Sequence, residues 1–473
     1  MLDILYYILY TFFVALYVYV IFVILMENRN PIKTLAWIML MMIVPMVGVL
    51  LFLIVGRNYR RTKLLIKRTG RVPKPKSNIY DFDKLSESGV PIRFQKLIRL
   101  LNSNSGSRLS VSNDVEVYAE GSAIFNSLYA DIERAESHIH LQFYIIENDS
   151  EGDKLQSLLK KKADEGVEVR VLYDFLGGWR LPTFWKQDLR QANVEIHSYN
   201  SFKNLFGFFM MNYRNHRKLV IIDGKIGYTG GVNLAERYRI GNELGDWRDT
   251  FIRISGEAVH EMQYSFLFDW NFVTGTRLRS IKYYPKIDAT GDKYIQIVTS
   301  SPDDEWENIM HGIINAINNA HSTIYIHSPY YMAPESIMVA LVTAALSGVD
   351  VRLLVPEHND SRLVAAASRS YFSRLLAGGV RVFLYQKNFL HSKAIVIDKY
   401  ISVIGTANMD TRSFEQNFEI SAFIYDEQTA EKLHDEFIND LSISRELNYN
   451  LWLSRPKIKK VKESIARLFS PIL

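Results

Sequence analysis

One short motif occurs twice in this chain of 473 residues and constrains its fold more than any other feature. Each copy has the pattern H-x-K-x-x-x-x-D. The two copies consist of His216, Lys218, Asp223 and His391, Lys393, Asp398. In each copy an Asn follows the His by seventeen positions, at Asn233 and Asn408. Two half-sites in one chain indicate one composite active site.

Both motifs are predicted to lie on strands. Residues 218–223 (KLVIID) and 393–398 (KAIVID) are β-branched, apolar runs that end in turn-forming residues. Because side chains alternate along a strand, the His and Lys of one motif should project from the same face. The Asp of each motif falls on the opposite face. We therefore expect Asp223 and Asp398 to have structural roles within the candidate catalytic set.

The similarity between the two halves extends beyond the motifs. Residues 137–149 (SHIHLQFYIIEND) parallel 322–334 (STIYIHSPYYMAP), and 165–177 (EGVEVRVLYDFLG) parallel 347–359 (SGVDVRLLVPEHN). Each pair keeps the same order ahead of its His. A single H-x-K-x-x-x-x-D pattern can arise by chance, but two copies in matching positions of similar halves indicate an internal duplication.

These motifs give the chain a close resemblance to the phospholipase D superfamily and, within it, to the bacterial cardiolipin synthases. The superfamily resemblance covers about residues 106–440. GYTGGVNLAERY (227–238) after the first motif and VIGTANMDTRSFEQNFE (403–419) after the second strengthen it. The resemblance implies an α/β fold in which two similar lobes pack around one cleft, with both His residues facing each other across it.

The expected organisation has six parts. They are a transmembrane hairpin at 1–56, a basic juxtamembrane linker at 57–105, a first lobe at 106–275, a connector at 276–292, a second lobe at 293–440, and a C-terminal amphipathic segment at 441–473. Within the linker we expect a short helix near 92–101. The first helix of the second lobe is expected at 303–320, with Trp306 and Ile309 on its core face.

The residue inventory suits phosphodiester exchange. Such a reaction needs a nucleophile, an acid for the departing alkoxide and positive charge around the phosphoryl oxygens. A pair of His, a pair of Lys and a pair of Asn supply these, with Asn233 and Asn408 as candidate phosphate ligands. No metal is required by that set. The sequence has no P-loop, no dinucleotide fingerprint and no cysteine, so it implies neither a nucleotide cofactor nor thiol chemistry.

One neutral imidazole would attack phosphorus to form a phosphohistidine, while the other would protonate the leaving alcohol. The resemblance favours His216 as nucleophile and His391 as acid, although the near symmetry of the halves leaves this order open. Each imidazole needs a partner that fixes its tautomer. The resemblance implies carboxylates, with Asp249 and Glu419 as candidates. Three further acids compete for the role of Asp249: Asp246, Glu243 and Glu236.

The amino-terminal end predicts a membrane anchor. Residues 4–26 are uncharged and apolar, and 34–55 form a second apolar run interrupted by Pro45 and Gly48. The short turn between them predicts a two-helix hairpin with both ends on one side. A cleavable signal peptide is disfavoured because no Lys or Arg precedes the first run. The anchor segments NRNPIKTLAWIML and PMVGVLLFLIVGRN also resemble the membrane anchor of bacterial cardiolipin synthases.

Charge around the anchor predicts its orientation. Only Arg29 and Lys33 carry positive charge in the turn. Seven basic residues follow the second run: Arg57, Arg60, Arg61, Lys63, Lys67, Arg68 and Arg71. The positive-inside bias then places the duplicated domain in the cytoplasm, on the inner membrane of a bacterial cell.

Two other stretches are candidates for contact with lipid. Residues 201–218 carry a cluster of Phe, Leu and Met that either enters the membrane interface or packs between the lobes. Near the carboxyl end, a helix is predicted with one apolar face and many Lys residues elsewhere. That face consists of Ile458, Val461, Ile465 and Leu468. This helix either lies on anionic lipid or docks on the protein.

The resemblance implies a phosphatidyltransferase. One phosphatidylglycerol would donate its phosphatidyl group and release glycerol, and a second would accept the group. Alternatives are a phospholipase D that uses water and a relative that uses another acceptor such as phosphatidylethanolamine. A membrane-tethered nuclease is disfavoured by the anchor, and the small net charge of +5 argues against wholesale polyanion binding, so no nucleic acid partner is expected. The oligomeric state is left open.

Overall fold

The computed structural model describes residues 2–26, 31–53, 90–199, 213–287, 291–471 and 473. Most of the predicted basic linker and the apolar part of the 201–218 stretch lie outside the described residues.

The two halves repeat one order of elements, as the sequence predicted. The first repeat contains β1 (Ser110–Glu120), α6 (Gly121–Glu133), β2 (His138–Phe143), α7 (Ser150–Asp164), β3 (Glu168–Asp174), α8 (Thr183–Gln191), β4 (Glu195–Tyr199), β5 (Leu219–Ile222), β6 (Ile226–Gly230), α10 (Arg237–Ile240), β7 (Trp247–Gly256) and α11 (Ala258–Thr274). The second contains β8 (Lys293–Ser300), α12 (Asn308–Asn318), β9 (Thr323–His327), β10 (Tyr331–Met332), α13 (Glu335–Leu346), β11 (Asp350–Pro356), α14 (Arg362–Ala377), β12 (Arg381–Tyr385), β13 (Phe389–Leu390), β14 (Ala394–Ile397), β15 (Ile401–Gly405), β16 (Met409–Asp410), α15 (Thr411–Glu415), β17 (Glu419–Tyr425) and α16 (Glu427–Ser442).

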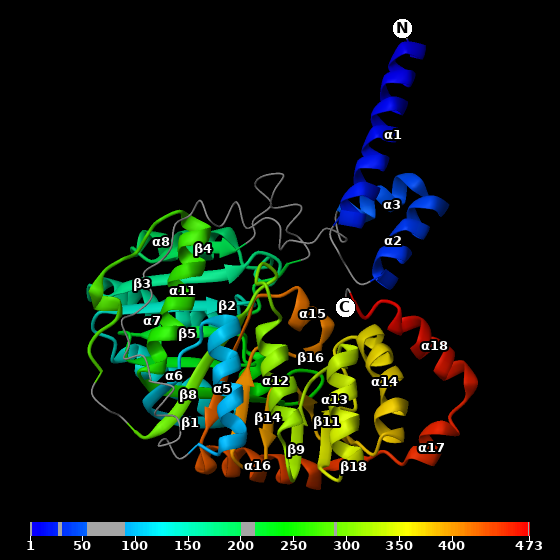
Figure 1. Ribbon diagram of the computed structural model, residues 1–473. Coiled ribbons are helices and arrows are strands. Elements are labelled where there is room, and N and C mark those ends of the chain that lie inside the picture. Colours follow the sequence, from blue (N-terminus) through cyan, green and yellow to red (C-terminus); the bar gives the residue numbers. More distant parts are fainter. Residues whose placement is uncertain (1, 27–30, 54–89, 200–212, 288–290, 472) are drawn as a thin grey trace.

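The strands of both repeats follow the same spatial order. It runs β1-β7-β6-β5-β2-β3-β4 in the first repeat and β8-β17-β15-β14-β9-β11-β12 in the second, and β18 (Ser444–Glu446) extends the second at its edge. The two series join where β1 pairs antiparallel with β8. In each repeat the strands next to this junction are antiparallel and the outer ones are parallel. Helices pack on the sheet faces, so the fold is mixed α/β (Figure 1).

Three hydrophobic clusters hold this arrangement together. One lies in the first repeat and includes Phe389 of β13, and one lies in the second repeat. A third combines residues of both repeats, such as Ile221 and Ile254 with Ile404 and Ile420. The third cluster also includes buried side chains of α11 and α16, two long helices at corresponding positions. The lobes therefore share a core, and each needs the other to bury it.

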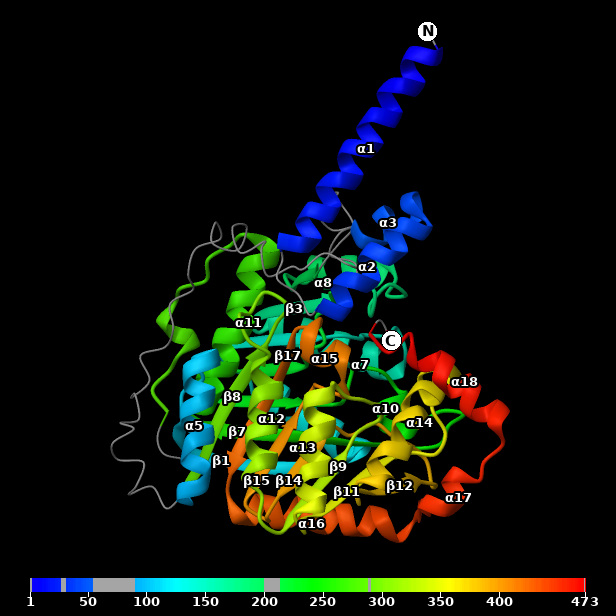
Figure 2. The same cartoon turned by 45° about the vertical axis from the view of Figure 1, so that its right-hand side comes forward.

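The helix predicted near 92–101 is present as α5 (Ile92–Ser105). Its buried residues Phe94, Leu97 and Leu101 belong to the core of the second repeat, although α5 precedes the first repeat in the chain. Figures 1 and 2 show α5 beside α12. The end of the predicted linker is thus part of the folded body.

The first helix of the second lobe begins later than predicted. α12 starts at Asn308, and Trp306 is half exposed in the preceding turn instead of lying on the core face. The carboxylate of Asp304 accepts from the backbone N–H of Ser301 and from the Asn308 side chain, which closes a turn at 301–304. Ile309, by contrast, is buried as expected.

The amino-terminal segment differs from the predicted two-helix hairpin. α1 (Leu2–Met26) is exposed along most of its length and, with 25 residues, is about 37 Å long, enough to cross a bilayer. Among the described residues it is the one helix with the length and composition of a membrane span. The second apolar run forms two short helices, α2 (Pro31–Ile43) and α3 (Pro45–Leu51). The two-helix hairpin is therefore not confirmed.

Pro45 and Gly48 explain the break. Val44, which precedes the proline, has φ −135° and ψ 77°, outside the helical region, as expected of a residue before proline. α3 then folds back on α2: a Cβ added at Gly48 would lie 2.8 Å from Met41 Cα. The rings of Trp37 and Phe52 meet edge to face at 5.5 Å. Pro45 and Gly48 thus turn the chain instead of merely interrupting a span.

Candidate active site

The two His residues lie on extended segments that cross from one repeat to the other. Residues 389–390 form β13, which pairs in parallel with β7, and the His391 N–H donates to the Arg248 carbonyl at 2.8 Å. The mirror arrangement places Asn215 beside Phe418, with the His216 N–H donating to the Phe418 carbonyl at 2.9 Å. The strands predicted from the motifs are shorter than expected: β5 and β14 begin just after Lys218 and Lys393.

This crossing brings each imidazole to a carboxylate of the other repeat. His216 Nδ1 lies 3.0 Å from Glu419 Oε1, and His391 Nδ1 lies 2.7 Å from Asp249 Oδ2. Both carboxylates are almost completely buried. The structure therefore joins the sequence-predicted His residues and orienting acids in crossed pairs, each made of one residue from either half.

Burial separates Asp249 from the acids that compete with it in the sequence. Asp246 and Glu243 are exposed, and Glu236 accepts from the Ser150 hydroxyl at 2.7 Å instead of approaching an imidazole. Asp249 is 2% exposed, and its Oδ1 also accepts from the backbone N–H of Thr250 at 2.7 Å. Asp249 is thus fixed in place before any ligand binds.

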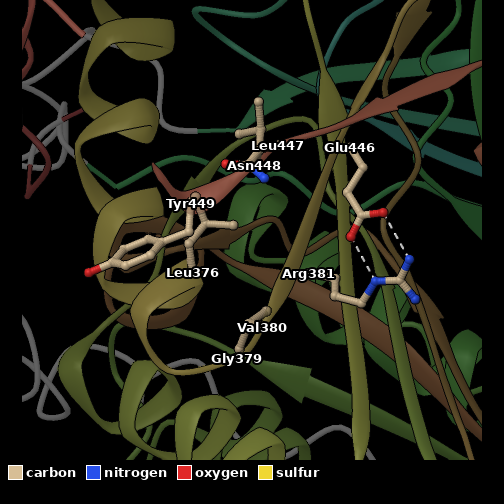
Figure 3. Close-up of a pocket in the computed structure, with 8 residues that line it drawn as sticks. All are labelled: Leu376, Gly379, Val380, Arg381, Glu446, Leu447, Asn448 and Tyr449. Atoms are coloured by element: carbon tan, nitrogen blue, oxygen red, sulfur yellow. Dashed lines mark hydrogen bonds and ion pairs between the residues drawn. The ribbon is translucent and has the colours of Figure 1, made fainter. Parts of the chain in front are cut away.

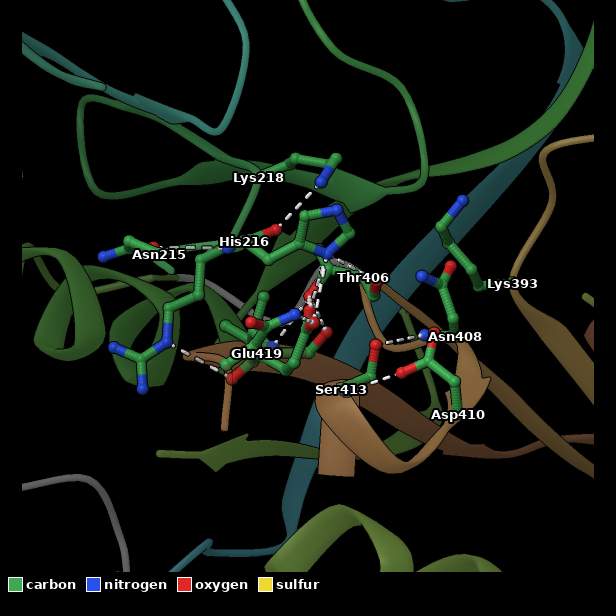
Figure 4. Close-up of polar contacts among 12 residues, drawn as sticks. Asn215, His216, Lys218, Lys393, Thr406, Asn408, Asp410, Ser413 and Glu419 are labelled. Atoms are coloured by element: carbon green, nitrogen blue, oxygen red, sulfur yellow. Dashed lines mark hydrogen bonds and ion pairs between the residues drawn. The ribbon is translucent and has the colours of Figure 1, made fainter. Parts of the chain in front are cut away.

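The remaining ring nitrogen of each imidazole is left for chemistry. Since Nδ1 is occupied by a carboxylate, Nε2 is the nitrogen that can reach a substrate. Aromatic rings fix the planes of the imidazoles: Tyr144 meets His216 at 5.0 Å between ring centroids, and Tyr238 and Trp247 meet His391 at 5.4 Å and 5.3 Å. Figure 4 shows the side chains of Lys218, Lys393 and Asn408 directed towards the space beside the His216 ring.

Both motif lysines are buried, and neither has a carboxylate in direct contact among the described residues. Lys218 Nζ donates to the His216 carbonyl at 2.9 Å, and Lys393 Nζ donates to the His391 carbonyl. Burial lowers the pKa of Lys218 to about 7 and that of Lys393 to about 8. Each lysine is also influenced by charges of the opposite half, since Glu419 and Asp249 both act on each of them. A bound anion between these two buried lysines would stabilise their charged forms.

Burial also controls the protonation of the other groups. It lowers the pKa of His216, and burial together with Lys393 lowers the pKa of His391 well below its ordinary value. Burial raises the pKa of Asp249 to about 6. Without substrate, both imidazoles are therefore neutral near pH 7.

The two predicted phosphate ligands differ in how they are held. Asn233 is 1% exposed; its Oδ1 accepts from the Ile145 N–H at 3.1 Å and its Nδ2 donates to the Tyr238 hydroxyl at 2.6 Å. Asn408 lies beside Lys393 in Figure 4, and its buried Oδ1 has no hydrogen-bond partner within the described part of the chain. Asn233 thus also has a structural task. The free Oδ1 of Asn408 can accept from a ligand hydroxyl, whereas only its Nδ2 can donate to a phosphoryl oxygen.

The motif Asp residues lie away from the imidazoles, as the strand pattern predicted. Asp223 accepts from the backbone N–H groups of Glu136, Ser137 and His138 at 2.7–2.9 Å. Asp398 binds the corresponding N–H groups of His321, Ser322 and Thr323 at 2.8–3.0 Å. Both Asp residues have positive φ, 53° and 52°. Each one ties the end of its motif strand to the start of the neighbouring strand.

Replacing Asp223 by Ala is expected to destabilise the protein by about 1–3 kcal/mol, because three backbone N–H groups, two of them in part-buried hydrogen bonds, lose their acceptor. The rate constant of the folded fraction should be nearly unchanged, since the side chain lies away from the imidazoles. Denaturant unfolding of the purified protein in detergent would measure the stability. Asp223→Asn, which keeps an acceptor and tolerates positive φ, is the matched control and should lose less. Normal stability with lost turnover would assign Asp223 to the chemistry instead.

Buried ion pairs behind the imidazoles hold the crossed segments. Asp269 of α11 accepts from Arg217 Nη1 at 2.9 Å and from Gln142 Nε2 at 2.6 Å. At the corresponding place in the second repeat, Asp440 of α16 accepts from Arg248 Nε at 3.1 Å and contacts His327 Nε2 at 3.0 Å. In the sequence, Arg217 directly follows His216, and Arg248 directly precedes Asp249. These ion pairs fix the backbone that carries the site.

Sequence reasoning missed several residues that touch the imidazoles. Thr406 donates from Oγ1 to Glu419 Oε2 at 2.5 Å, and its carbonyl lies 3.1 Å from His216 Nδ1. Tyr144, Tyr238 and Trp247 were also not singled out. Thr406 and Tyr238 do lie within the two segments that carried the family resemblance, 403–419 and 227–238, and this position was the only signal for them in the sequence.

A surface pocket of about 490 Å³ lies apart from the site, at the edge formed by β12 and β18. Figure 3 shows its lining, in which Arg381 and Glu446 form an ion pair with Nε and Oε1 2.8 Å apart. None of the motif residues lines it, so we assign it no part in the chemistry.

Known proteins are similar to this chain over nearly its whole length. The family model described as "Cardiolipin synthase, PLD-like domain" matches residues 128–270 and 313–441, and "Phospholipase_D-nuclease N-terminal" matches 15–57. A cardiolipin synthase from Geobacillus sp. (strain WCH70) is 38% identical over 462 residues, which cover 96% of this chain and 92% of that protein. One from Listeria monocytogenes is 38% identical and covers 98% of both chains.

Among solved structures, a phosphatidylserine synthase from Haemophilus influenzae Rd KW20 is similar, with a TM-score of 0.63. The alignment covers 80% of this chain and 99% of that one at 14% sequence identity. This likeness shows that the two proteins share a fold.

Proposed function

The chain belongs to the phospholipase D-like cardiolipin synthase family, and we propose that it joins two phosphatidylglycerol molecules through a phosphohistidine intermediate. It is an enzyme, a phosphatidyltransferase. The observation that carries the proposed mechanism is the crossed pairing of His216 with Glu419 and of His391 with Asp249, which makes one site from two repeats. Two buried lysines beside this site suit one phosphodiester anion.

In the first half-reaction, His216 Nε2 attacks phosphorus of the donor phosphatidylglycerol. The bond from phosphorus to the glycerol headgroup oxygen breaks, and His391 donates a proton to that oxygen, so that glycerol leaves. Glu419 stabilises the positive charge that develops on the His216 ring. Lys218, Lys393 and the two Asn side chains would stabilise the charge on the phosphoryl oxygens.

In the second half-reaction, the terminal hydroxyl of another phosphatidylglycerol replaces glycerol. His391, now neutral, accepts the hydroxyl proton as the oxygen attacks phosphorus. The bond to His216 Nε2 breaks, which releases cardiolipin and regenerates both imidazoles. One phosphodiester is exchanged for another, so the reaction needs no activated donor.

Substrate binding would prepare His391 for its role as acid. Its pKa is lowered by burial and then by the charge of Lys393. A bound phosphodiester carries one negative charge, which offsets the field of the lysines and raises the pKa of the imidazole. The acid would thus gain its proton together with the substrate, while His216, paired with Glu419, attacks in its neutral form.

We expect kcat/KM to fall as the pH rises from about 7 to above 8, because the free enzyme loses the charge of both lysines over this range. Burial lowers the pKa of Lys218 to about 7 and that of Lys393 to about 8, so each ammonium deprotonates as the pH rises through these values. Bound phosphodiester raises both pKa values, so kcat should persist to higher pH. Initial rates with dispersed phosphatidylglycerol would measure both profiles.

The Lys393→Arg variant is the control for this profile, because a guanidinium stays charged throughout the range. The step near pH 8 should be absent from its profile, while the step of Lys218 near pH 7 should remain, even where its maximal rate is lower. A wild-type kcat/KM that stays constant to about pH 10 would contradict the assignment of these steps to the lysines.

The enzyme is proposed to work at the cytoplasmic face of a bacterial inner membrane. α1 has the length of a membrane span, and the basic residues between 57 and 71 support a cytoplasmic body through the positive-inside bias. A multi-pass topology has support only from the composition of the second apolar run, since α2 and α3 fold back on each other. Phospholipid in the bilayer is the proposed substrate.

The test uses the full chain in proteoliposomes that contain phosphatidylglycerol with defined acyl chains. We expect glycerol and a four-acyl phospholipid in equal molar amounts. Phosphatidic acid without cardiolipin would instead identify a hydrolase. A parallel sample with added phosphatidylethanolamine would show whether another acceptor competes.

A further inference from the structure

The C-terminal helix docks on the second repeat through one face. α18 (Lys457–Arg467) follows α17 (Tyr449–Leu453) and buries Ala466, which clusters with Met332 and Ala367 of α14. Arg455 holds its start: the guanidinium lies 3.2 Å from the centre of the Trp452 ring and binds the buried Glu463 carboxylate at 2.7 Å. The orientation of α18 on the body is therefore fixed.

The opposite face of the same helix is apolar and exposed. Ile458, Val461, Ile465 and Leu468 recur at helical spacing, and their exposed fractions are 63%, 52%, 54% and 76%. The sequence alone predicts that this helix either docks on the protein or lies on lipid. The structure shows that it is docked and still presents the predicted apolar face. Such a face, held outward by a fixed helix, needs an occupant.

Charge along the helix indicates which occupant it is. α18 carries five basic side chains: Lys457, Lys459, Lys460, Lys462 and Arg467. Its single acidic residue, Glu463, is paired with Arg455 on the docked side. At 100° per residue, Lys457 and Lys462 flank the apolar face on either side. An apolar strip between lysines matches a bilayer with anionic headgroups.

We propose that this face of α18 lies in the interface of an anionic phospholipid bilayer and forms a second membrane contact beside α1. Figures 1 and 2 show the C-terminal end of the chain on the side of the body from which α1, α2 and α3 project. The C-terminal end and the membrane helix therefore lie on the same side of the body, so that both can face one bilayer. The contact goes beyond the proposed chemistry and does not depend on which phospholipid is the acceptor.

This contact would orient the active site. After α18 the chain returns to the site: the Pro471 carbonyl accepts from Gln416 Nε2 at 2.8 Å, directly after α15. α15 begins next to Asn408, whose backbone N–H donates to the Ser413 hydroxyl at 3.2 Å. A bilayer bound to α18 would thus set the tilt of the active site relative to the lipid surface. A single span such as α1 cannot fix that tilt alone.

The test exploits the absence of cysteine from the sequence, which allows single labels in the full chain. Spin labels would be attached at Val461→Cys and Ile465→Cys on the apolar face. Ser464→Cys on the polar side of α18 is one control. Ile438→Cys is the other, because Ile438 is an exposed apolar residue of α16. Figure 1 shows α16 on the side of the body opposite α1. Each variant would be reconstituted in vesicles of phosphatidylglycerol and phosphatidylcholine.

Labels at 461 and 465 should be exposed to oxygen dissolved in the bilayer and shielded from a water-soluble nickel chelate. Both control labels should show the reverse. Vesicles of phosphatidylcholine alone should shift the two apolar-face labels towards water, because the lysines lose their anionic partner. Cardiolipin formation in detergent would be measured for each variant to show that the fold and the chemistry are intact.

Two results would overturn the proposal. Labels at 461 and 465 as accessible to the chelate as the control at 464 would place α18 in water. Labels shielded from both reagents and dipolar-coupled between chains would make the occupant a second copy of the chain. If cardiolipin still forms in detergent, either result rejects the membrane contact alone. If the labels at 461 and 465 are exposed to lipid but the unlabelled wild-type chain forms no cardiolipin, only the proposed function is rejected.

Substituting Ser for the four exposed apolar residues provides a second measurement. Because none of them is in a core cluster, the fold should survive. The apparent KM for phosphatidylglycerol in vesicles should rise severalfold, while activity on detergent-dispersed lipid stays unchanged. An unchanged KM in vesicles would count against the contact.

Discussion

Replacing either site imidazole by Ala is expected to lower the rate of cardiolipin formation by about 10⁴-fold or more. His216→Ala removes the nucleophile, and His391→Ala leaves the departing glycerol oxygen without a proton. Neither imidazole belongs to a core cluster: His216 contacts Tyr144 and Glu419, and His391 contacts Asp249 and the core rings of Tyr238, Trp247 and Phe389. Those three rings also pack on one another, so they keep their mutual contacts when the imidazole is removed. Both variants should therefore remain folded and bound to the membrane.

A donor with an acidic leaving group distinguishes the two roles. Such a group departs without protonation, so His391→Ala should release one equivalent per chain in a burst and then stop or turn over slowly. His216→Ala should show no burst. His358→Ala, an exposed histidine away from both motifs, is the control and should behave as wild type. Activity within tenfold of wild type in either site variant would refute the mechanism.

The second large effect concerns the crossed carboxylates. Glu419→Gln and Asp249→Asn should each slow synthesis by about 10²–10⁴-fold, the range expected when an imidazole loses the group that fixes its tautomer and stabilises its charged form. Because the pairs cross, Glu419→Gln should impair formation of the covalent intermediate. Asp249→Asn should impair protonation of the leaving group by His391, although Asp249 lies in the same repeat as His216.

The same activated donor tests this crossing. It should restore the first half-reaction of Asp249→Asn and leave Glu419→Gln slow. Asp246→Asn and Glu243→Gln change exposed acids of the same loop and should have little effect. The opposite pattern, with Glu419→Gln rescued and Asp249→Asn not, would mean that each carboxylate serves the imidazole of its own half.

Much of this site could be predicted from the sequence because each copy of the repeated motif is a short, continuous segment of the chain. The spacing of His216 and Lys218 placed both on one side of an extended segment, and the alternation of a strand separated Asp223 from them. The repeated flanking segments predicted two similar α/β halves. These inferences need only short-range periodicity, and the strand order of the two repeats confirms the duplicated fold.

The partner of each imidazole could not be predicted in the same way. It depends on β13 pairing with β7 and on Asn215 pairing with Phe418, contacts between residues 142 and 203 positions apart. Asp249 and its exposed neighbours have the same chemistry in the sequence, and only burial separates them. Such long-range pairing is a property of the packed lobes.

Two other expectations show where composition misleads. The run 34–55 is apolar enough to cross a bilayer, but Pro45 stops the first helix and Gly48 lets the second one fold back at close range. For α18, docking on the protein and exposing an apolar face do not exclude each other. One face is buried against α14 while another remains exposed. Because a helix has several faces, one predicted environment cannot describe the whole helix.

The central claim is that imidazoles from two repeats act on one phosphorus atom. Mass spectrometry of the enzyme quenched during turnover with phosphatidylglycerol tests it most directly. We expect at most one phosphatidyl group per chain, on the peptide that contains His216, and none in His216→Ala. Two phosphatidyl groups on one chain, on His216 and His391 together, would mean two independent sites, and a wild-type enzyme that turns over without any covalent adduct would contradict the phosphohistidine.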